Sequence, residues 1–161
     1  MSTLGKILSI TEVNNLKLSN SGSLNGSNGS RLGMGQMINA LCGYSGYDGY
    51  KITTDKHEFL ILIDNMQSCC ENWGYFYLND DTEMFIGAKL REVNLTDMAL
   101  NKQKVEESDY YGGGDGDDIQ FVDFVTNKGV LQFAVYNEHN GYYGHPIIFA
   151  KDEEIFHSDT L

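Results

Sequence analysis

The sequence predicts an α+β domain, with a mostly antiparallel sheet of about six or seven strands and one or two short helices. Three observations lead to this prediction. Short runs of β-branched and aromatic residues recur along the chain between glycine, asparagine and aspartate turn signals. Helical spacing is visible in one short segment, an N-cap signal indicates a second short helix, and no internal repeat is visible. The length of 161 residues suits a single domain over residues 1–161.

The N-terminal part combines a strand, a flexible tract and a helix. Apolar residues alternate loosely over Leu4–Leu18, which indicates a strand or a short helical turn followed by a strand. Ser19–Ser30 reads SNSGSLNGSNGS and has almost no apolar surface to offset the entropy of ordering, so we expect a flexible insertion over residues 19–30. Leu32–Cys42 has apolar residues at helical spacing, and Gly43 would end that helix.

The middle of the chain has the strongest β signals. We expect strands at Tyr50–Thr54, Phe59–Ile63, Tyr75–Leu78 and Leu90–Leu95. The run Phe59–Ile63 is apolar throughout and is predicted to be a buried strand. Asn79–Thr82 supplies an N-cap for a short helix over Glu83–Ile86.

A hairpin is predicted where Asn127-Lys128-Gly129 separates the β-rich runs Ile119–Thr126 and Val130–Tyr136. Within the second run, alternate apolar residues should face the core: Leu131, Phe133 and Val135.

Asn140-Gly141 signals a further turn, and Ile147–Phe149 should return as a strand that begins near Pro146. The last ten residues carry acidic side chains and are expected to fray.

The formal net charge of −12 argues against binding to nucleic acid or to an anionic membrane surface. No apolar run is long enough to span a bilayer, and the N-terminus lacks the pattern of a signal peptide. The odd count of three cysteines fits the reducing cytoplasm. Cys69 and Cys70 are adjacent and are interpreted as structural residues, with a metal site or a reactive thiol as the alternatives.

The acidity is concentrated in a predicted exposed loop over residues 101–118. We interpret this loop as a surface that occupies lysine and arginine clusters which otherwise hold phosphates. Tyrosines in it would supply anchoring area. The predicted partner-binding residues are Glu106, Glu107, Asp109, Tyr110, Tyr111, Asp115, Asp117 and Asp118. Two alternatives are a loop that aids solubility and a calcium site, although the spacing is not that of an EF-hand.

Ten tyrosines, several within glycine-rich turns, are typical of a recognition surface, or they fill a small β-core. A second functional hypothesis is therefore a protein that sequesters a nucleotide-like signal between the turns around Tyr47 and Tyr142. A third is a metal-dependent enzyme that uses His139, His145 or the aspartate-rich loop. The sequence contains no catalytic motif, so the leading hypothesis has no enzymatic activity and no cofactor.

Four segments resemble an uncharacterised family of small domains from bacteriophage and mobile-element genomes. They are Gly46–Tyr50, the strand that ends at Ile63, Gln67–Glu71 with its C-C-E element, and Asn140–Tyr143. The resemblance extends over Tyr44–Phe149, and Ser19–Ser30 and Glu106–Asp118 look like additions to it. It implies a phage accessory protein that acts inside a bacterium. By analogy with anti-CRISPR inhibitors, its partner would be the basic surface of a host defence nuclease in the host cytoplasm.

Overall fold

The computed structural model describes residues 3–16, 46–66, 72–110, 119–138 and 144–161. This part of the chain contains nine strands, one short α-helix and one 3-10 helix. In chain order they are β1 (Ile7–Leu16), β2 (Tyr47–Thr54), β3 (Glu58–Asp64), β4 (Asn72–Tyr77), η1 (Glu83–Phe85), β5 (Leu90–Thr96), α2 (Lys102–Glu107), β6 (Ile119–Thr126), β7 (Gly129–Glu138), β8 (Pro146–Lys151) and β9 (Glu154–Thr160).

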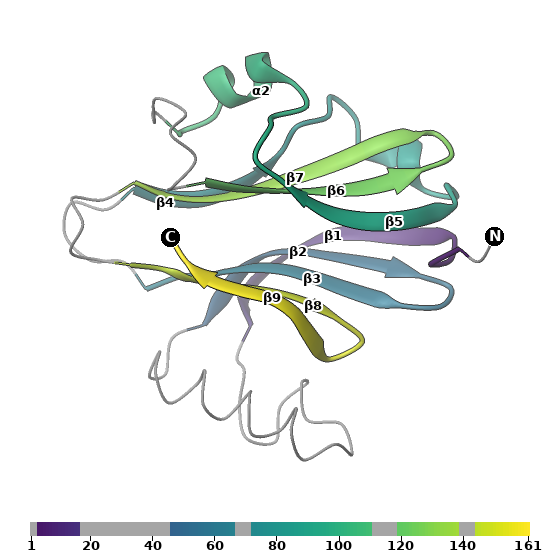
Figure 1. Cartoon of the computed structure of the whole chain (residues 1–161), viewed down its shortest axis with the longest axis horizontal. Helices are drawn as coiled ribbons and strands as arrows, with labels where there is room; N and C mark the ends of the chain where they lie inside the picture. Colours follow the sequence, from purple (N-terminus) through teal and green to yellow (C-terminus); the bar gives the residue numbers. More distant parts are fainter. Residues whose placement is uncertain (1–2, 17–45, 67–71, 111–118, 139–143) are drawn as a thin grey trace.

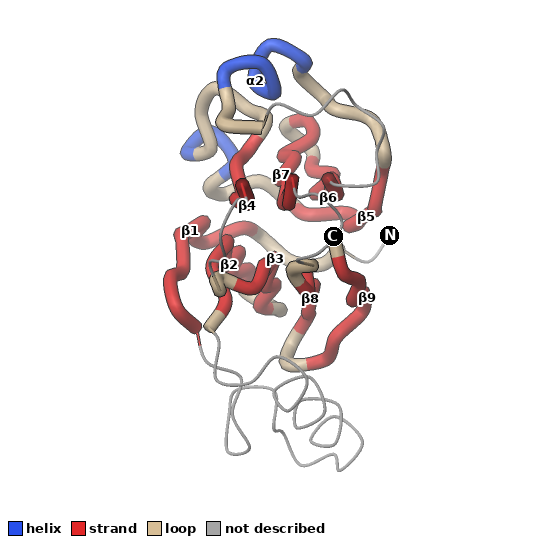
Figure 2. The backbone as a smooth tube through the Cα atoms, turned by 90° about the vertical axis from the view of Figure 1, so that its left-hand side faces the viewer, coloured by secondary structure: helices blue, strands red, loops and turns tan. Residues whose placement is uncertain are grey.

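The strands form two sheets that face each other (Figure 1, Figure 2). One sheet has the order β1-β2-β3-β8-β9 and the other the order β4-β7-β6-β5, with antiparallel pairing throughout. The predicted α+β class with one sheet is therefore wrong, because the described part is mostly β. The sequence could not reveal the second sheet, because apolar alternation shows that a strand has a buried face but not which strands it pairs with. The predicted helix over Leu32–Cys42 lies outside the described residues.

The main core lies between the sheets and takes side chains from both. Phe59 of β3 meets Phe124 of β6 edge-to-face at 5.4 Å between ring centroids, and Phe124 meets Phe133 of β7 at 5.5 Å. These three rings are at most 1% exposed. Each buried ring contributes about 1.5–3 kcal/mol relative to an exposed one.

Strand β3 is buried on both of its faces. Phe59, Ile61 and Ile63 belong to the main core. Leu60 and Leu62 belong to a second apolar cluster, together with Tyr47, Ile148 and Ala150. This explains why Phe59–Ile63 is apolar throughout instead of alternating, and it confirms the predicted buried strand.

The predicted hairpin between β6 and β7 is confirmed. Thr126 pairs with Gly129, so Asn127 and Lys128 form a connection that is one residue shorter than expected. Gly129 has a φ of 121°, which a side chain would strain. Leu131, Phe133 and Val135 all lie in the main core, as their alternation predicts.

Two further expectations differ from the structure. The last residues, expected to fray, form β9, which pairs with β8 from Pro146↔Thr160 to Lys151↔Glu154. The helix predicted over Glu83–Ile86 is only the 3-10 helix η1, since Ile86 already has extended dihedral angles of −64° and 127°.

A short N-terminal segment joins the two sheets. Leu4 N–H donates to Leu90 O at 2.8 Å, and Leu90 N–H donates to Gly5 O at 2.8 Å. Two more bonds connect Ile7 with this stretch, one from Ile7 N–H to Ala88 O at 2.9 Å and one from Gly87 N–H to Ile7 O at 2.8 Å. The beginning of β1 is thereby held against the beginning of β5.

Candidate functional site

The predicted acidic loop begins with a short helix that is fixed at both ends. The Asn101 side chain accepts a hydrogen bond from Gln103 N–H at 3.1 Å and caps the start of α2. After α2, the Ser108 hydroxyl donates to Val105 O at 2.6 Å and accepts from Tyr110 N–H at 3.2 Å. Within the expected loop over residues 101–118, Lys102–Glu107 are therefore helical, and most of this helix is exposed, as expected.

Tyr110 is buried, whereas the sequence suggested an exposed anchor. It is 5% exposed, and its ring centroid lies 5.3 Å from that of Tyr136. Both belong to an apolar cluster with Phe121 and Ala134, against which Val105 of α2 also packs. Tyr110 thus attaches α2 to the four-stranded sheet, so in this structure its ring is unavailable as an anchor for a partner.

The other predicted site residues divide into two groups. Glu106, Glu107 and Asp109 are exposed, as expected. The remaining four lie outside the described residues: Tyr111, Asp115, Asp117 and Asp118.

The fold brings one further carboxylate to α2. Lys104 Nζ lies 3.1 Å from Asp80 Oδ1 and 3.8 Å from Glu107 Oε2. The hydrogen bond to Asp80 is the main reason that the pKa of Lys104 is raised. We call Asp80, Glu106, Glu107 and Asp109 the acidic surface. The sequence could not assign Asp80 to it, because the link is a contact between residues far apart in the chain.

Tyrosines gather at a different place, the edge where β1 of one sheet lies beside β4 of the other (Figure 2). The Tyr50 ring centroid lies 5.3 Å from that of Tyr75 and 6.1 Å from that of Tyr77, in edge-to-face arrangements. The Tyr75 hydroxyl donates to the Glu12 carboxylate and to Asn14 Oδ1, the latter at 3.3 Å. We call Glu12, Tyr50, Tyr75 and Tyr77 the edge cluster.

Burial is the largest cause of a raised pKa for both Tyr50 and Tyr75, and the Glu12 carboxylate raises both further. Both hydroxyls therefore stay protonated at neutral pH. Of the other tyrosines discussed from the sequence, Tyr47 is 1% exposed, whereas Tyr142 lies outside the described residues. One side of the pocket predicted between their turns therefore lies outside the described residues.

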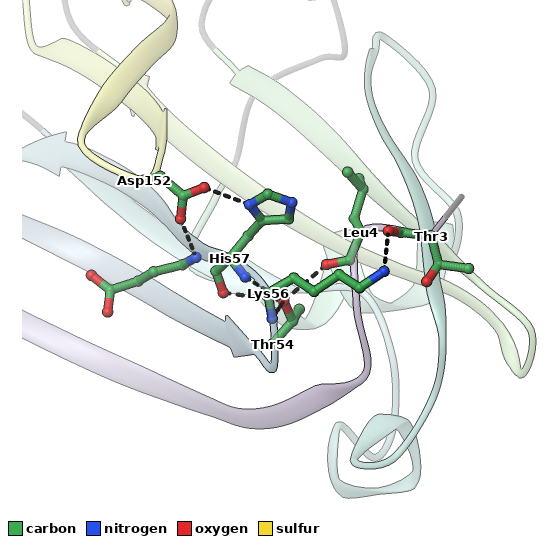
Figure 3. A network of polar contacts seen from close by, with 7 residues as sticks. Thr3, Leu4, Thr54, Lys56, His57 and Asp152 are labelled. Atoms are coloured by element: carbon green, nitrogen blue, oxygen red, sulfur yellow. Dashed lines mark hydrogen bonds and ion pairs between the residues drawn. The ribbon is translucent and has the colours of Figure 1, made fainter. Parts of the chain in front are cut away.

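A polar network joins the turns at one end of the five-stranded sheet (Figure 3). His57 Nδ1 lies 2.5 Å from Asp152 Oδ2, and Asp152 Oδ1 accepts from Glu58 N–H at 2.9 Å. Desolvation alone would raise the pKa of Asp152, but the bond from Glu58 and the contact with His57 together lower it. The Thr54 hydroxyl donates to Leu4 O at 2.8 Å and so connects this turn to the N-terminal segment. The network therefore holds together the turn between β2 and β3, the turn between β8 and β9, and the N-terminal segment.

His145, one of the histidines considered for a metal site, is buried. It is 2% exposed, its ring stacks on Trp73 at 5.4 Å between centroids, and its Nδ1 lies 2.7 Å from Asp64 O. His139 and the three cysteines lie outside the described residues. Within the described ranges, no group of three or more histidine, cysteine, aspartate and glutamate residues is arranged to hold a metal ion.

Among the described residues, no helix has the length and apolar character needed to cross a bilayer.

These features define a protein of two packed antiparallel sheets, with exposed carboxylates around α2 and tyrosines at one edge. By sequence, the chain belongs to the family described as "Domain of unknown function (DUF7448)", whose family model matches residues 2–149. This confirms the expected membership of an uncharacterised domain family, and the match includes both the acidic surface and the edge cluster. No curated protein and no solved structure matches the chain significantly.

Proposed function

We propose that this protein inhibits a host defence nuclease by binding stoichiometrically to the nuclease's basic, nucleic-acid-binding region. In this proposal it is an accessory protein of phage or mobile-element origin that works in the host cytoplasm, in the manner of anti-CRISPR inhibitors. The observation that carries the proposal is the exposed set of carboxylates on α2 and beside it. This set belongs to a chain with a net charge of −12.

The attachment of α2 supports this role. Val105 and Tyr110 pack on the four-stranded sheet, which leaves Glu106, Glu107 and Asp109 at the surface. Carboxylates held on a packed element lose less conformational entropy on binding than carboxylates on a free loop. They can compete with phosphates for lysine and arginine, and the association is expected to be fast and to weaken with salt.

The experiment compares two triple variants that change the net charge equally. The test variant is Glu106→Lys, Glu107→Lys and Asp109→Lys. The control is Glu153→Lys, Glu154→Lys and Asp159→Lys, which alters exposed residues of β9 and the turn before it in the other sheet. Each variant is immobilised to recover basic nucleases from a bacterial lysate, and a recovered nuclease is then purified for titration.

We expect the wild-type protein and the control to bind the purified nuclease and to displace its DNA at a 1:1 ratio. The test variant should bind about 100-fold more weakly or worse, because each reversed charge now repels the basic region. Circular dichroism verifies that both variants are folded. Equal DNA displacement by the test variant and the control would show that the acidic surface only keeps the protein in solution.

A further inference from the structure

We infer that the edge cluster is a binding site for an arginine side chain of the partner, with Tyr77 and Tyr75 as the aromatic walls and Glu12 as the counter-ion. This inference rests on the proposed function, because it takes the partner to be a basic protein. It adds a specific contact to the less specific attraction of the acidic surface.

The site is built by strand register. Glu12 of β1 lies directly across from Tyr50 of β2, and in the other sheet Tyr75 and Tyr77 of β4 lie across from Val135 and Phe133 of β7. Tyr50, Phe133 and Val135 belong to the main core, so Glu12, Tyr75 and Tyr77 lie on the faces that point between the sheets. Because β1 and β4 are edge strands, these side chains reach the margin of the core, where solvent begins.

At this margin, exposed side chains lie next to the buried rings of the core. Tyr50 is 8% exposed and its ring centroid lies 4.8 Å from that of Phe133, so it forms a fixed base. Tyr77 is 38% exposed, and Glu12 is exposed as well. The rings of Tyr75 and Tyr77 pack against the buried ring of Tyr50, and the exposed carboxylate of Glu12 lies beside Tyr75. This arrangement provides contact area that is already ordered before a partner binds.

The charged groups around the rings are the carboxylates of Glu12 and Asp48 and the Lys104 ammonium group, which lies within electrostatic range of Tyr77 and is paired with Asp80. The Glu12 carboxylate accepts the Tyr75 hydroxyl hydrogen, which holds both groups in place. Asp48 lies on the same side, where its Oδ1 accepts from Asn15 N–H at 2.8 Å and from Asn65 Nδ2 at 3.0 Å. A cation over a tyrosine face is stabilised by the ring, and a nearby carboxylate adds to this attraction.

Arginine fits this site better than lysine. Its planar guanidinium can stack on an aromatic ring such as that of Tyr77, which is partly exposed, while its N–H groups donate to a carboxylate, whereas an ammonium group is compact and more strongly hydrated. The edge cluster is also close to the acidic surface along the chain, since Tyr77 ends β4 and Asp80, which binds Lys104, follows three residues later. One basic segment can therefore contact both.

The experiment titrates the full chain with two probes, a hexa-arginine and a hexa-lysine peptide, by calorimetry and by NMR of the labelled protein. The test variants are Tyr77→Ala and Glu12→Gln. Their matched controls, both in β9, are Phe156→Ala, which removes a ring that is 44% exposed, and Glu154→Gln, which removes one exposed charge. Thermal unfolding of each variant verifies its fold.

We expect hexa-arginine to bind more tightly than hexa-lysine and to shift resonances of Tyr75 and Tyr77. Tyr77→Ala should weaken hexa-arginine binding about fivefold and remove the preference over hexa-lysine, and Glu12→Gln should weaken binding to a similar degree. The inference is wrong if Phe156→Ala and Glu154→Gln weaken binding as much, or if both peptides bind the wild type equally well.

Binding of the purified nuclease separates this inference from the proposed function. If the triple variant of the acidic surface loses the nuclease while Tyr77→Ala retains it fully, the proposed function stands and the arginine site is wrong. If Tyr77→Ala weakens nuclease binding and the triple variant does not, the edge cluster is supported and the assigned role of the acidic surface fails.

Discussion

Buried polar side chains determine how connecting segments attach to the sheets. Gln132 of β7 is 1% exposed, and its side-chain oxygen accepts from Leu100 N–H at 2.7 Å. Its side-chain nitrogen donates to Met98 O at 3.0 Å and to Asp123 Oδ1 at 2.7 Å. One glutamine therefore fixes the segment that leads from β5 to α2, and with it the position of the acidic surface.

The hydrogen bond from Glu58 N–H to Asp152, together with the contact between Asp152 and His57, makes stability depend on pH. Because the folded state lowers the pKa of Asp152, its carboxylate stabilises the fold above the unfolded pKa of about 3.9, and this contribution is lost as the pH falls through the lower folded value. We expect Asp152→Asn to reduce the free energy of unfolding at pH 7 by about 0.5–1 kcal/mol, given how exposed the pair is. The difference from wild type should shrink in acid. Urea unfolding at a series of pH values measures this.

Asparagine suits this substitution because Asp152 has a φ of 52°, which asparagine also tolerates. The control is Asp159→Asn, which removes an exposed carboxylate of β9 that lies outside this network. A constant difference between Asp152→Asn and the wild type at all pH values would contradict the assigned role of the carboxylate.

Single residues also show what the sequence could and could not predict about the site. The alternation of Leu131, Phe133 and Val135 is enough to identify a core face, because neighbours on a strand point to opposite sides. Tyr110 lies in an acidic, glycine-rich stretch that contains no such pattern. Its burial depends on Tyr136, a contact between residues far apart in the chain, and therefore its prediction as an exposed anchor failed.

Among the elements, the sequence predicted strands well and their partners poorly. The strands around Phe59–Ile63 and Leu90–Leu95 were recognised from local composition. Strand β9 was missed because most of its residues are polar and at least partly exposed, and it is ordered by its backbone bonds to β8. Likewise, α2 has six residues, too few for helical periodicity to be visible in the sequence.

The packing of α2 leads to a test of the role of Tyr110. We expect Tyr110→Ala to lower the free energy of unfolding by about 2–4 kcal/mol, because it removes a ring from the cluster with Tyr136 and Phe121. Tyr110→Phe keeps the ring and should lose much less. Chemical denaturation of both variants measures the difference. An unchanged stability of Tyr110→Ala would mean that the ring is at the surface, as the sequence suggested.

For the whole molecule, net charge is a cost to stability as well as a means of recognition. Carboxylates outnumber cationic side chains by twelve, so they repel each other in the compact state. We expect the thermal unfolding midpoint to rise by a few degrees between about 0.01 and 0.15 M NaCl, as the Debye length falls from roughly 30 to 8 Å. Scanning calorimetry measures this.

The triple variant Glu106→Lys, Glu107→Lys and Asp109→Lys tests whether repulsion among these carboxylates causes the salt dependence of the unfolding midpoint. It has fewer negative charges, so its midpoint should depend less on salt than that of the wild type. An equal salt dependence in both proteins would show that repulsion among these carboxylates contributes little to the stability of the fold.

The hydrogen bonds of the N-terminal segment to residues 87–90 have a consequence for how the protein folds during synthesis. The hydrogen bond between Leu4 and Leu90 can form only after Leu90 has been translated. The pairing of β3 with β8 likewise needs residues far apart in the chain, since Glu58 and Asp152, which are hydrogen-bonded, are 94 residues apart. Such long loop closures slow folding. The four-stranded sheet cannot be completed on the ribosome until β7 has emerged from the exit tunnel, and the five-stranded sheet cannot be completed until β9 has emerged. Until then the nascent chain presents unpaired strands to which chaperones would bind.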